Sequence, residues 1–586
     1  MLKKHSELDM IIKGAFEKNH LEIIGIRFYG ETYLKLDSMP DKKRFKDGRF
    51  IFLNSNSNID YILKTFKEAQ WEDSAEIALS EFHQLKNLEK NNLQTKNTDI
   101  EFKEYPEIFK TKPLNHQFKA FELSKNLEFY GLFFEQGCGK TKVIIDTASY
   151  LFLNKKIQSI VVVAPNGVHE NWLVDEMPKH CKIEYDEFLW QGKFSKSTLI
   201  NLDKMIAKSD KLKIFSFNIE SFVGEKQKAV LLKILKQNDT LLVIDESQTI
   251  KNHKAKRTKF FETISHYAKY RRIMTGTPIT NGIENIYTQL KFLSPSIIGI
   301  SSFYAFQSKY CATKKFGLGQ NKSYEKIVGY KSIEELQNKI QSHTYRVLKK
   351  DCLDLPDKIY QKENFDLTIE QRRIYDELKK EGITYIQMCK DQNIPITFDN
   401  VLVRMKKMQQ VSLGYMLNIE EKSIVEVVKP ENNPRLLKLK ELLEKINGKV
   451  IIWTIYTQDI IYISQMLGAE AVRYDGKTSE EQKQLNKKRF KEDAKIKYLI
   501  ANTQAMARGH TLTEAETSIY YCNSFDLELR LQSEDRNHRQ GTKNNILYID
   551  IQANKTVDSR IINALRHKKK IADYALQDVE NIFMDD

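Results

Sequence analysis

Short apolar runs rich in β-branched residues alternate with helical segments in two parts of the chain, and this pattern limits the available folds more than any other feature. The first part holds "SIVVVAP", "KIFSFN", "TLLVIDE" and "YRRIMTGTP", and the second, after residue 435, holds "KVIIWT", "YLIANT", "TSIYYCN" and "NILYIDI". Strands covered by helices on both faces have such sequences, because a parallel sheet is buried on both sides. We therefore predict an α/β fold with two parallel-sheet lobes.

A chain of 586 residues is too long for one core and should divide into several domains. The segments outside these lobes have a different sequence pattern. The N-terminal part mixes apolar runs with one helical period, and a polar stretch follows it. Amphipathic segments with helical spacing separate the lobes. We predict a small α+β accessory domain, a polar linker, a first lobe, a helical insertion and a second lobe, at residues 1–85, 86–105, 106–298, 299–435 and 436–586 respectively.

The chain is basic, with 93 Lys and Arg against 78 Asp and Glu and a formal net charge of +15. Such a field attracts polyanions such as nucleic acid, although Lys-rich usage can also follow from genome composition. Hydrophobic residues make up 41% and charged residues 29% of the chain, which argues against global disorder.

The six cysteines are scattered, without a C-x-x-C pair or a Cys/His cluster. We expect reduced thiols and no structural zinc. The start, "MLKKHSELDM", becomes charged before any apolar stretch of signal-peptide length, and no run of eighteen apolar residues follows. We expect a soluble, intracellular protein without a membrane segment.

The stretch "FFEQGCGKTKVIID", residues 133–146, combines a buried strand, a glycine-rich turn and a helix. Gly137 and Gly139 lack a Cβ, so backbone N–H groups can approach phosphate oxygens, and the helix N-terminus favours negative charge there. Lys140 would reach the β- and γ-phosphates of ATP, and Thr141 would offer its hydroxyl to Mg²⁺. Phe134 stands where the longer phosphate-loop pattern has its first glycine, so an ordinary strand-to-helix turn is the alternative.

The run "TLLVIDESQ" ends in Asp245 and Glu246. A parallel sheet would place both carboxylates at its carboxyl edge, where α/β folds bind ligands. Asp245 would hold Mg²⁺, and Glu246 would orient and deprotonate the attacking water. Two acidic residues that merely end a strand are the alternative, and the Gly-Lys-Thr turn in the same lobe argues against it.

The second lobe contains "LQSEDRNHRQG", in which Gln532, Arg536 and Arg539 follow helical spacing. On one helix they would share a face. Two guanidinium groups aimed at another lobe's phosphates would act as catalytic arginine fingers. A solvated helical face is the alternative.

These motifs, in this order, resemble the SWI/SNF-type ATPases of helicase superfamily two over about residues 110–575. Further matching segments are "LNHQ", "VVVAPNGVHENWLVDEMPKH", "MTGTPITNGIENIYTQLKFLSP" and "YRVLKKDCLDLPDK". The family's short phosphate loop has no glycine at the position of Phe134. The resemblance implies two RecA-like lobes, ATP with Mg²⁺, and translocation on double-stranded DNA without processive unwinding.

The resemblance also assigns roles to single residues. Gln117 would read the adenine, and Thr275, Gly276 and Thr277 would couple hydrolysis to movement. The segment "AMARG" departs from the family's glycine pair, so only Gly509 of this segment is carried over as an ATP contact. The acidic motif is "DESQ" where the family commonly has DEAH or DEGH, and we expect Gln248 to alter coupling.

Duplex DNA gripped mainly by its phosphates would be bound with little sequence preference and strong salt dependence. Basic clusters supply the candidate contacts, although each also fits a solvated face. These candidates are Lys254, Arg257, Lys349, Lys350, Arg404 and Lys407, with a further cluster at residues 567–570.

The N-terminal segment from "IIGIRFYG" to "NIDYILKTF" resembles the HARP-type module found beside some annealing helicases. That resemblance implies an action on branched DNA, with the module recognising the junction. Two other functions fit the sequence: the motor of a restriction or phage-defence complex whose nuclease lies on another chain, and an ATP-binding DNA scaffold with weak turnover. We expect a cytoplasmic protein of a prokaryote or phage rather than a nuclear one.

Overall fold

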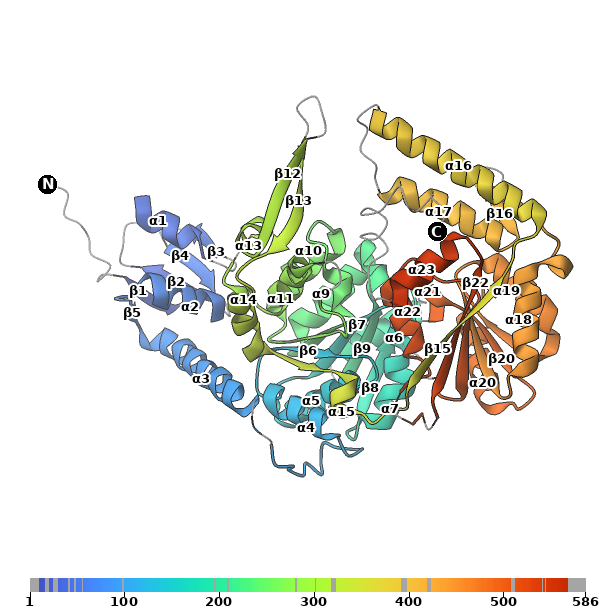
Figure 1. Ribbon diagram of the computed structural model, residues 1–586. Coiled ribbons are helices and arrows are strands. Elements are labelled where there is room, and N and C mark those ends of the chain that lie inside the picture. The colour runs from blue at the N-terminus through green and yellow to red at the C-terminus, as the bar shows by residue number, and fades with distance from the viewer. Residues whose placement is uncertain are drawn as a thin grey trace. The chain divides into compact units, whose positions relative to one another are not determined.

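The structure of the chain is a computed structural model (Figure 1). It describes residues 10–566 except for 16–19, 25–29, 40–42, 47–48, 55, 97, 99, 193–195, 208–209, 280–281, 301, 318–322, 392–397, 419–422, 507–511, 540 and 543. The chain divides into two compact units. The first comprises residues 1–314 and 325–352, and the second comprises residues 315–324 and 353–586.

The N-terminal part of the first unit is a small α+β module. Its described strands form a mixed sheet in the order β3-β4-β2-β1-β5, with bounds Ile11–Gly14 (β1), His20–Ile24 (β2), Lys43–Lys46 (β3), Arg49–Leu53 (β4) and Gln70–Trp71 (β5). Three helices accompany the sheet, Gly30–Asp37 (α1), Asn56–Thr65 (α2) and Asp73–Lys96 (α3). Apolar side chains of all three helices share one core with the strands.

Residues 86–96 of the predicted polar linker are helical, because α3 continues to Lys96. Leu, Lys, Glu and Gln are good helix formers, so a stretch that is polar by composition can still extend a helix. The end of α3 is also fixed by tertiary contacts. The Lys96 Nζ donates to the carbonyl oxygens of Gln341 and Thr344 at 3.0 and 2.8 Å, next to an edge strand of the first lobe.

The first lobe is built on a parallel sheet whose described strands follow the order β14-β6-β11-β10-β7-β9-β8. Their bounds are Phe129–Phe134 (β6), Ser159–Ala164 (β7), Tyr185–Leu189 (β8), Leu212–Asn218 (β9), Thr240–Asp245 (β10), Tyr270–Met274 (β11) and Thr344–Val347 (β14). Every residue of β6, β7, β10 and β11 is buried. The apolar runs of β6, β7 and β10 thus became central strands, as the sequence pattern predicted, and the central strand β11 also contains Arg271 and Arg272.

Helices lie on both sides of this sheet, with α9, α10 and α11 on one side and α4 and α5 on the other (Figure 1). The helices of the lobe are Asn115–Ser124 (α4), Lys140–Leu153 (α5), Val168–Asn171 (α6), Met177–His180 (α7), Lys196–Ala207 (α8), Glu225–Gln237 (α9), Lys256–Ile264 (α10), Tyr287–Leu293 (α11), Pro295–Ile298 (α12), Phe303–Tyr310 (α13), Ile333–Ile340 (α14) and Lys349–Cys352 (α15).

Three neighbouring strands in this sheet carry the predicted ATP-site motifs. Strand β11 pairs with β6 on one side and β10 on the other, and its Met274 lies opposite Leu132 and Asp245. Because all three strands are parallel, their carboxyl ends meet at one edge. The glycine-rich turn, the Thr275 segment and the acidic pair therefore converge, although more than a hundred residues separate the turn from the acidic pair.

The second unit contains a parallel sheet whose described strands follow the order β15-β22-β21-β18-β20-β19. The bounds are Lys358–Phe365 (β15), Lys449–Thr454 (β18), Ala471–Tyr474 (β19), Tyr498–Asn502 (β20), Ala515–Tyr520 (β21) and Ile546–Ala553 (β22). Its helices are Ile369–Asp391 (α16), Phe398–Ser412 (α17), Pro434–Lys445 (α18), Thr457–Leu467 (α19), Glu480–Glu492 (α20), Thr503–Met506 (α21), Leu527–Glu534 (α22) and Val557–Arg566 (α23). The predicted α/β fold with two parallel-sheet lobes and a small α+β N-terminal region is confirmed.

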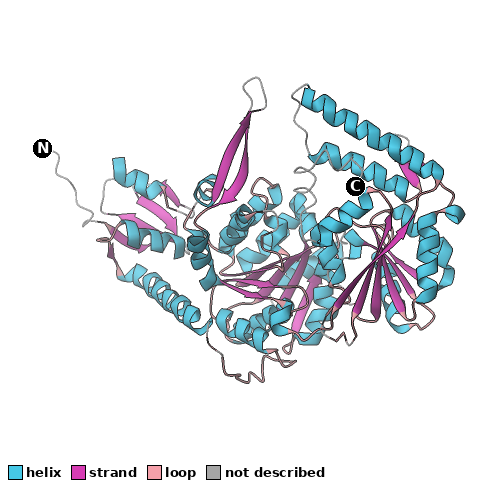
Figure 2. Ribbon diagram, viewed as in Figure 1, coloured by secondary structure: helices cyan, strands magenta, loops and turns pink. Residues whose placement is uncertain are grey.

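The description of residues 299–435 as a helical insertion was incomplete. This region holds α16 and α17, but also β14 and β15, which are the edge strands of the two parallel sheets (Figure 2). It further contains two small sheets, Cys311–Gly317 with Ser323–Tyr330 (β12 and β13) and Tyr415–Asn418 with Ser423–Glu426 (β16 and β17). Edge and ribbon strands are partly solvated, so their sequences lack the continuous apolar run that marks a central strand. The other predicted domain boundaries stay a prediction.

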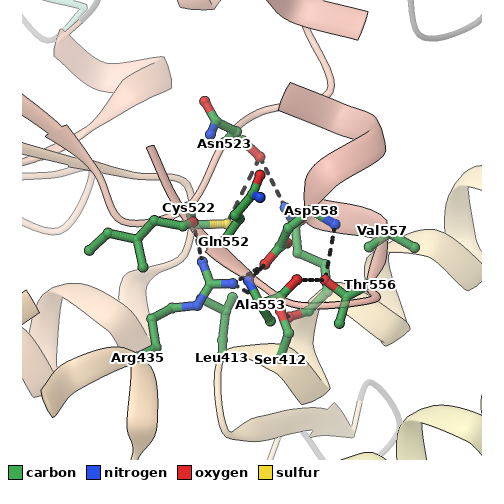
Figure 3. A network of polar contacts seen from close by, with 12 residues as sticks. Ser412, Leu413, Arg435, Cys522, Asn523, Gln552, Ala553, Thr556, Val557 and Asp558 are labelled. Carbon is green, nitrogen blue, oxygen red and sulfur yellow. Dashed lines mark hydrogen bonds and ion pairs between the residues drawn. The ribbon is translucent and has the colours of Figure 1, made fainter. Parts of the chain in front are cut away.

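A buried arginine connects several elements of the second unit (Figure 3). Arg435 of α18, 1% exposed, forms an ion pair with Asp558 of α23. Its guanidinium group also donates to the carbonyl oxygens that follow β21 and lie within β22, and to the Ser412 hydroxyl at the end of α17. Asp558 in turn accepts from the backbone N–H of Ala553. One charge pair thus joins three helices to the sheet.

Replacing Arg435 by methionine should destabilise the second unit by about 3–5 kcal/mol, because the buried Asp558 carboxylate loses its partner. Urea unfolding, followed by hydrogen exchange in peptides of β21 and β22, measures this loss. The matched control is Lys445→Met, since the Lys445 side chain is 65% exposed and its ion pair with Glu441 lies on the surface. Equal stability of the Arg435→Met variant and the wild type would refute the structural role of this network.

Candidate functional site

The glycine-rich turn of residues 135–139 connects β6 to α5. Gly137 and Gly139 have φ angles of 86° and 78°, in the left-handed region that favours glycine. A Cβ on Gly139 would lie 2.1 Å from the Gln117 side-chain nitrogen. The turn therefore needs glycine at position 139 for two independent reasons, backbone conformation and space.

Helix α4 holds this turn from one side. The Gln117 Nε2 donates to the Cys138 carbonyl oxygen at 3.3 Å, and the His116 Nε2 lies 2.8 Å from the same oxygen. The Gln117 Oε1 accepts from the Leu114 backbone N–H at the start of α4. Gln117, which sequence resemblance identified, therefore lies against the turn. His116 was not identified, although it stands beside Gln117 in the quoted "LNHQ" segment.

Lys140 opens α5 and is buried at the base of the turn. Its Nζ donates to the Phe134 carbonyl oxygen at the end of β6, at 2.9 Å. Phe134 is fully buried as the last residue of β6, so this position serves as a packed strand end rather than as part of the turn. Thr141 follows in the first turn of α5 and is half-buried.

The acidic pair lies at the end of β10. Asp245 accepts a hydrogen bond from the Trp172 Nε1 at 3.0 Å, and Glu246 adopts a left-handed backbone with a φ of 51°. Burial, and secondarily the neighbouring Glu246 carboxylate, raises the pKa of Asp245 to about 7. Two adjacent buried carboxyl groups and a strained backbone at one position are typical of a functional site.

A chain of side-chain contacts connects this pair to the neighbouring strand. The Glu246 carboxylate accepts from the Gln248 Nε2 at 2.9 Å, and the Gln248 Oε1 accepts from the Thr275 hydroxyl at 2.6 Å. On the other side, the Gln136 Nε2 donates to the Glu246 Oε1 at 3.3 Å. Gln248, noted in the sequence as a departure from the family pattern, therefore bridges the acidic pair and the Thr275 segment.

The Thr275 segment also contacts the glycine-rich turn directly. The Thr275 hydroxyl accepts from the Thr277 backbone N–H at 3.0 Å. A Cβ on Gly276 would lie 3.3 Å from the Phe134 carbonyl oxygen and 3.5 Å from the Gln136 nitrogen. Gly276 thus lies close to Gln136 of the turn, and Thr275 is connected to Glu246 through Gln248.

In the second unit the predicted helical face is shorter than expected. Helix α22 ends at Glu534, so it contains Gln532, while Arg536 and Arg539 lie in the turns that follow. Each arginine still points back by one turn: the Arg536 Nε donates to the Gln532 carbonyl at 2.9 Å, and the Arg539 Nε donates to the Asp535 carbonyl at 3.0 Å. These hydrogen bonds satisfy carbonyl oxygens at the end of the helix, an arrangement that the residue spacing alone did not indicate.

The remaining predicted site residues are dispersed. Gly509 and residues 567–570 lie outside the described residues. Lys254 precedes α10 and is exposed, and Arg257 is half-buried in its first turn. Lys349 and Lys350 open α15, and the Lys349 backbone N–H donates to the Glu135 carboxylate in the glycine-rich turn at 2.8 Å. Arg404 and Lys407 lie on α17. Their contacts with DNA stay predictions.

The chemistry of this edge fits a nucleoside triphosphate with a divalent cation. A glycine-rich turn with no room for a Cβ at position 139, followed by a helix N-terminus, suits a phosphate chain. The buried carboxyl pair suits Mg²⁺, which proteins commonly hold through one or two carboxylates together with substrate phosphates. Among the described residues, no group of three or more His, Cys, Asp and Glu side chains could hold a metal ion by itself. The described helices include none that is long and apolar enough to cross a membrane.

Comparisons with known families define the class first. The description "SNF2-related domain" matches residues 122–425, and "Helicase conserved C-terminal domain" matches residues 434–541. These two domains define a helicase-like ATPase. Because the first match covers more than half of the chain, the protein belongs to the SNF2-related family, which confirms the resemblance drawn from its motifs.

Curated relatives agree with this assignment. ATP-dependent helicase brm of Drosophila melanogaster is 26% identical over 473 residues, covering 76% of this chain and 28% of the relative. An uncharacterized ATP-dependent helicase of Mycoplasma pneumoniae is 24% identical over 464 residues, covering 77% of this chain and 40% of the relative. The chain thus spans well under half the length of these relatives. A solved Sulfolobus solfataricus SWI2/SNF2 ATPase core in complex with dsDNA is 22% identical, covers 81% of this chain and 95% of that chain, and has a TM-score of 0.35.

Replacing Gln248 by leucine should lower the free energy of unfolding of the first unit by about 1–3 kcal/mol, because buried polar atoms of Glu246 and Thr275 lose their partner. Urea unfolding measures the change. The matched control is Gln237→Leu at the exposed end of α9, which should change stability by less than about 0.5 kcal/mol. Equal effects of the two substitutions would contradict a bridging role for Gln248.

Proposed function

We propose that this chain is an ATP-hydrolysing motor that moves along double-stranded DNA. It would remodel protein–DNA complexes, or anneal and remodel branched DNA, without processive strand separation. The observation that carries the proposal is the buried chain of contacts from Glu246 through Gln248 to Thr275, beside a glycine-rich turn suited to phosphate, in a member of the SNF2-related family. Membership of the SNF2-related family alone supports an ATPase. The contacts from Glu246 to Thr275 suggest how the acidic pair and the Thr275 segment cooperate.

In this proposal the residues of the first lobe bind ATP and activate water. Lys140 exchanges the Phe134 carbonyl for phosphate oxygens, and backbone N–H groups of the turn donate to the phosphates. Asp245 and Thr141 would hold Mg²⁺, which offsets the phosphate charge when bound. Glu246 takes the proton of the attacking water, and Gln136 and Gln248 hold its carboxylate in one orientation. Gln117, which lies against the glycine-rich turn, would read the base.

Residues of the second unit would act in hydrolysis, as the family resemblance implies. Arg536 and Arg539 would neutralise charge on the transferring phosphoryl group, and Gln532 would support Arg536. Their present backbone acceptors are neutral carbonyl oxygens, which a phosphate can replace with a stronger charge-assisted bond. Gly509 is proposed as a further ATP contact.

Gln248 would transmit the state of the acidic pair to Thr275, Gly276 and Thr277. An amide does not titrate, so this connection would keep the same hydrogen bonds across the physiological pH range, whereas histidine at this position would change charge. Lys254, Arg257, Lys349, Lys350, Arg404 and Lys407 are proposed to contact DNA phosphates. Such contacts would weaken steeply with salt.

The proposal is tested by displacement of a third strand from a DNA triplex, which reports movement along a duplex without strand separation. The wild type should release the third strand when ATP is present. Glu246→Gln should bind ATP within about threefold of the wild-type affinity, yet lose turnover at least about a hundredfold and release no third strand, because the proton acceptor is gone. Lys140→Ala should instead lose ATP affinity.

Wild-type turnover in Glu246→Gln would remove Glu246 as the base. Unchanged ATP affinity in Lys140→Ala would remove its phosphate role. ATP hydrolysis by the wild type without any third-strand release would overturn movement along duplex DNA while leaving the ATPase intact.

The affinity for Mg·ATP should weaken as pH falls from 8 to 6.5. Burial beside Glu246 raises the pKa of Asp245 to about 7, so the nucleotide-free protein takes up a proton as the pH falls through this value. A cation binds only the carboxylate, so the loss should be about fourfold. Titration with a fluorescent ATP analogue measures it. Asp245→Asn is the matched control and should bind more weakly at both pH values without this dependence; a wild-type affinity independent of pH would contradict the assignment.

A further inference from the structure

The glycine-rich turn contains a buried thiol whose sulfur lies close to that of a second cysteine. Cys138 stands between Gly137 and Gly139 and is fully buried. Its Sγ lies 3.7 Å from the Sγ of Cys352, the last residue of α15. Both thiols are free, and both belong to the first unit. The fold therefore places a pair of thiols at the turn, although 214 residues separate them in the sequence.

Backbone and side-chain contacts hold the two segments of this pair together. Glu135, three residues before Cys138, makes two hydrogen bonds with the segment that leads to Cys352. Its backbone N–H donates to the Val347 carbonyl oxygen at 2.9 Å, and its carboxylate accepts from the Lys349 backbone N–H at 2.8 Å. On the other side, two side chains of α4 contact the Cys138 carbonyl oxygen. The approach of the two sulfur atoms is thus built into the packing around the turn.

The distance between the sulfur atoms suits a disulfide that has not yet formed. The sulfur atoms of a disulfide lie about 2.05 Å apart, so the pair would have to close by about 1.6 Å. Neighbouring thiols can also bind a metal. However, among the residues that the structure describes, no group of three or more His, Cys, Asp and Glu side chains could hold one. Oxidation therefore fits this pair better than metal binding.

The two thiols differ in their access to solvent. Cys352 is half-buried, whereas no part of Cys138 is exposed. Burial raises the pKa of Cys138 to about 12 and also raises the pKa of Cys352, so both are protonated near neutral pH. An oxidant from solvent would consequently react slowly, and first with Cys352. Cys138 then lies within reach of the oxidised sulfur.

We propose that Cys138 and Cys352 form a reversible disulfide in the presence of hydrogen peroxide, and that this bond inhibits ATP turnover. Disulfides in reducing compartments are usually transient, which suits a switch in the cytoplasmic setting expected from the sequence. The effect on turnover rests on the proposed function, whereas formation of the bond does not.

The reaction takes two steps. In the first, the Cys352 sulfur attacks one peroxide oxygen. An S–O bond forms, the O–O bond breaks, and the other oxygen leaves as water with the thiol proton, which gives a sulfenic acid. In the second, the Cys138 sulfur attacks the Cys352 sulfur, the S–S bond forms, and the hydroxyl group leaves as water with the Cys138 proton. The thiols lose two electrons, hydrogen peroxide is reduced to two waters, and a dithiol reverses the change by exchange.

The position of Cys352 in the chain explains why the bond would inhibit. Cys352 is the last residue of the first unit, and the chain continues into the second unit at residue 353. A disulfide would tie the glycine-rich turn to this crossing. In the proposed function, Lys140 must leave the Phe134 carbonyl oxygen for phosphate, and a turn that is covalently held two residues before Lys140 would resist this rearrangement.

The bond is tested on the full-length, nucleotide-free protein with hydrogen peroxide at about pH 8.5, where more of each thiol is ionised. After alkylation of the remaining thiols in denaturant, tryptic peptides are analysed by mass spectrometry without reductant. Residues 126–140 should be joined to residues 351–358 within one molecule, and dithiothreitol should separate them. Alkylated Cys138 and Cys352 without this joined pair, or a bond between two molecules, would refute the proposal.

The effect on turnover is measured before oxidation, after it, and after reduction with dithiothreitol. Wild-type turnover should fall at least about tenfold on oxidation and recover on reduction. Cys352→Ala should keep its turnover within about twofold under peroxide, because Cys138 has no partner. The matched control is Cys311→Ala, which removes another buried cysteine of the first unit and should respond to peroxide as the wild type does.

The outcomes separate this inference from the proposed function. Wild-type protein that carries the disulfide and retains full turnover would refute the inhibition while the motor stands. Equal losses in the wild type and Cys352→Ala would also refute it, because peroxide would then act elsewhere. If the reduced wild type hydrolyses no ATP, the proposed function falls and the inhibition falls with it. The disulfide is then judged by the joined peptides alone.

Discussion

The adjacency of β6, β11 and β10 is the constraint on which the rest of the first lobe depends. Parallel pairing brings three carboxyl ends to one edge, and each end continues into a different motif. The glycine-rich turn, the Thr275 segment and the acidic pair then need only short side chains to make contact. Gln248 uses this proximity, with one amide group touching both Glu246 and Thr275.

The same proximity has an energetic consequence. Burying Asp245 and Glu246 together is unfavourable unless other groups compensate, and the raised pKa of Asp245 reflects this cost. Trp172, Gln136 and Gln248 compensate in part through hydrogen bonds. In the proposed function a bound Mg²⁺ would offset this repulsion. The left-handed backbone at Glu246 is a second sign that local stability has been given up for function.

Sequence reasoning predicted those features that have a strong local signal. The central strands follow from apolar runs, and the turn follows from Gly137 and Gly139, which the structure shows in the left-handed region. The acidic pair follows from its place at a strand end. These features converge because topology, which alternating strands and helices indicate, determines which strand ends meet.

Features set by tertiary contacts or by solvent were not predictable in the same way. Helix α3 continues through a polar stretch and ends where Lys96 meets two backbone carbonyls. The edge strands β14 and β15 lack an apolar run because they are partly solvated, and α22 stops at Glu534 although the arginine spacing continues. The sequence marked Gln248 as unusual, but only the structure places its amide between Glu246 and Thr275.

The central proposal is that duplex DNA stimulates ATP hydrolysis by this chain. Steady-state ATP hydrolysis at fixed low salt tests it most directly, with no nucleic acid, single-stranded DNA, linear duplex, forked DNA and double-stranded RNA compared side by side. The account predicts stimulation by duplex DNA and at least as much by the fork. Stimulation only by single strands or by RNA, or no hydrolysis with any of them, would contradict it.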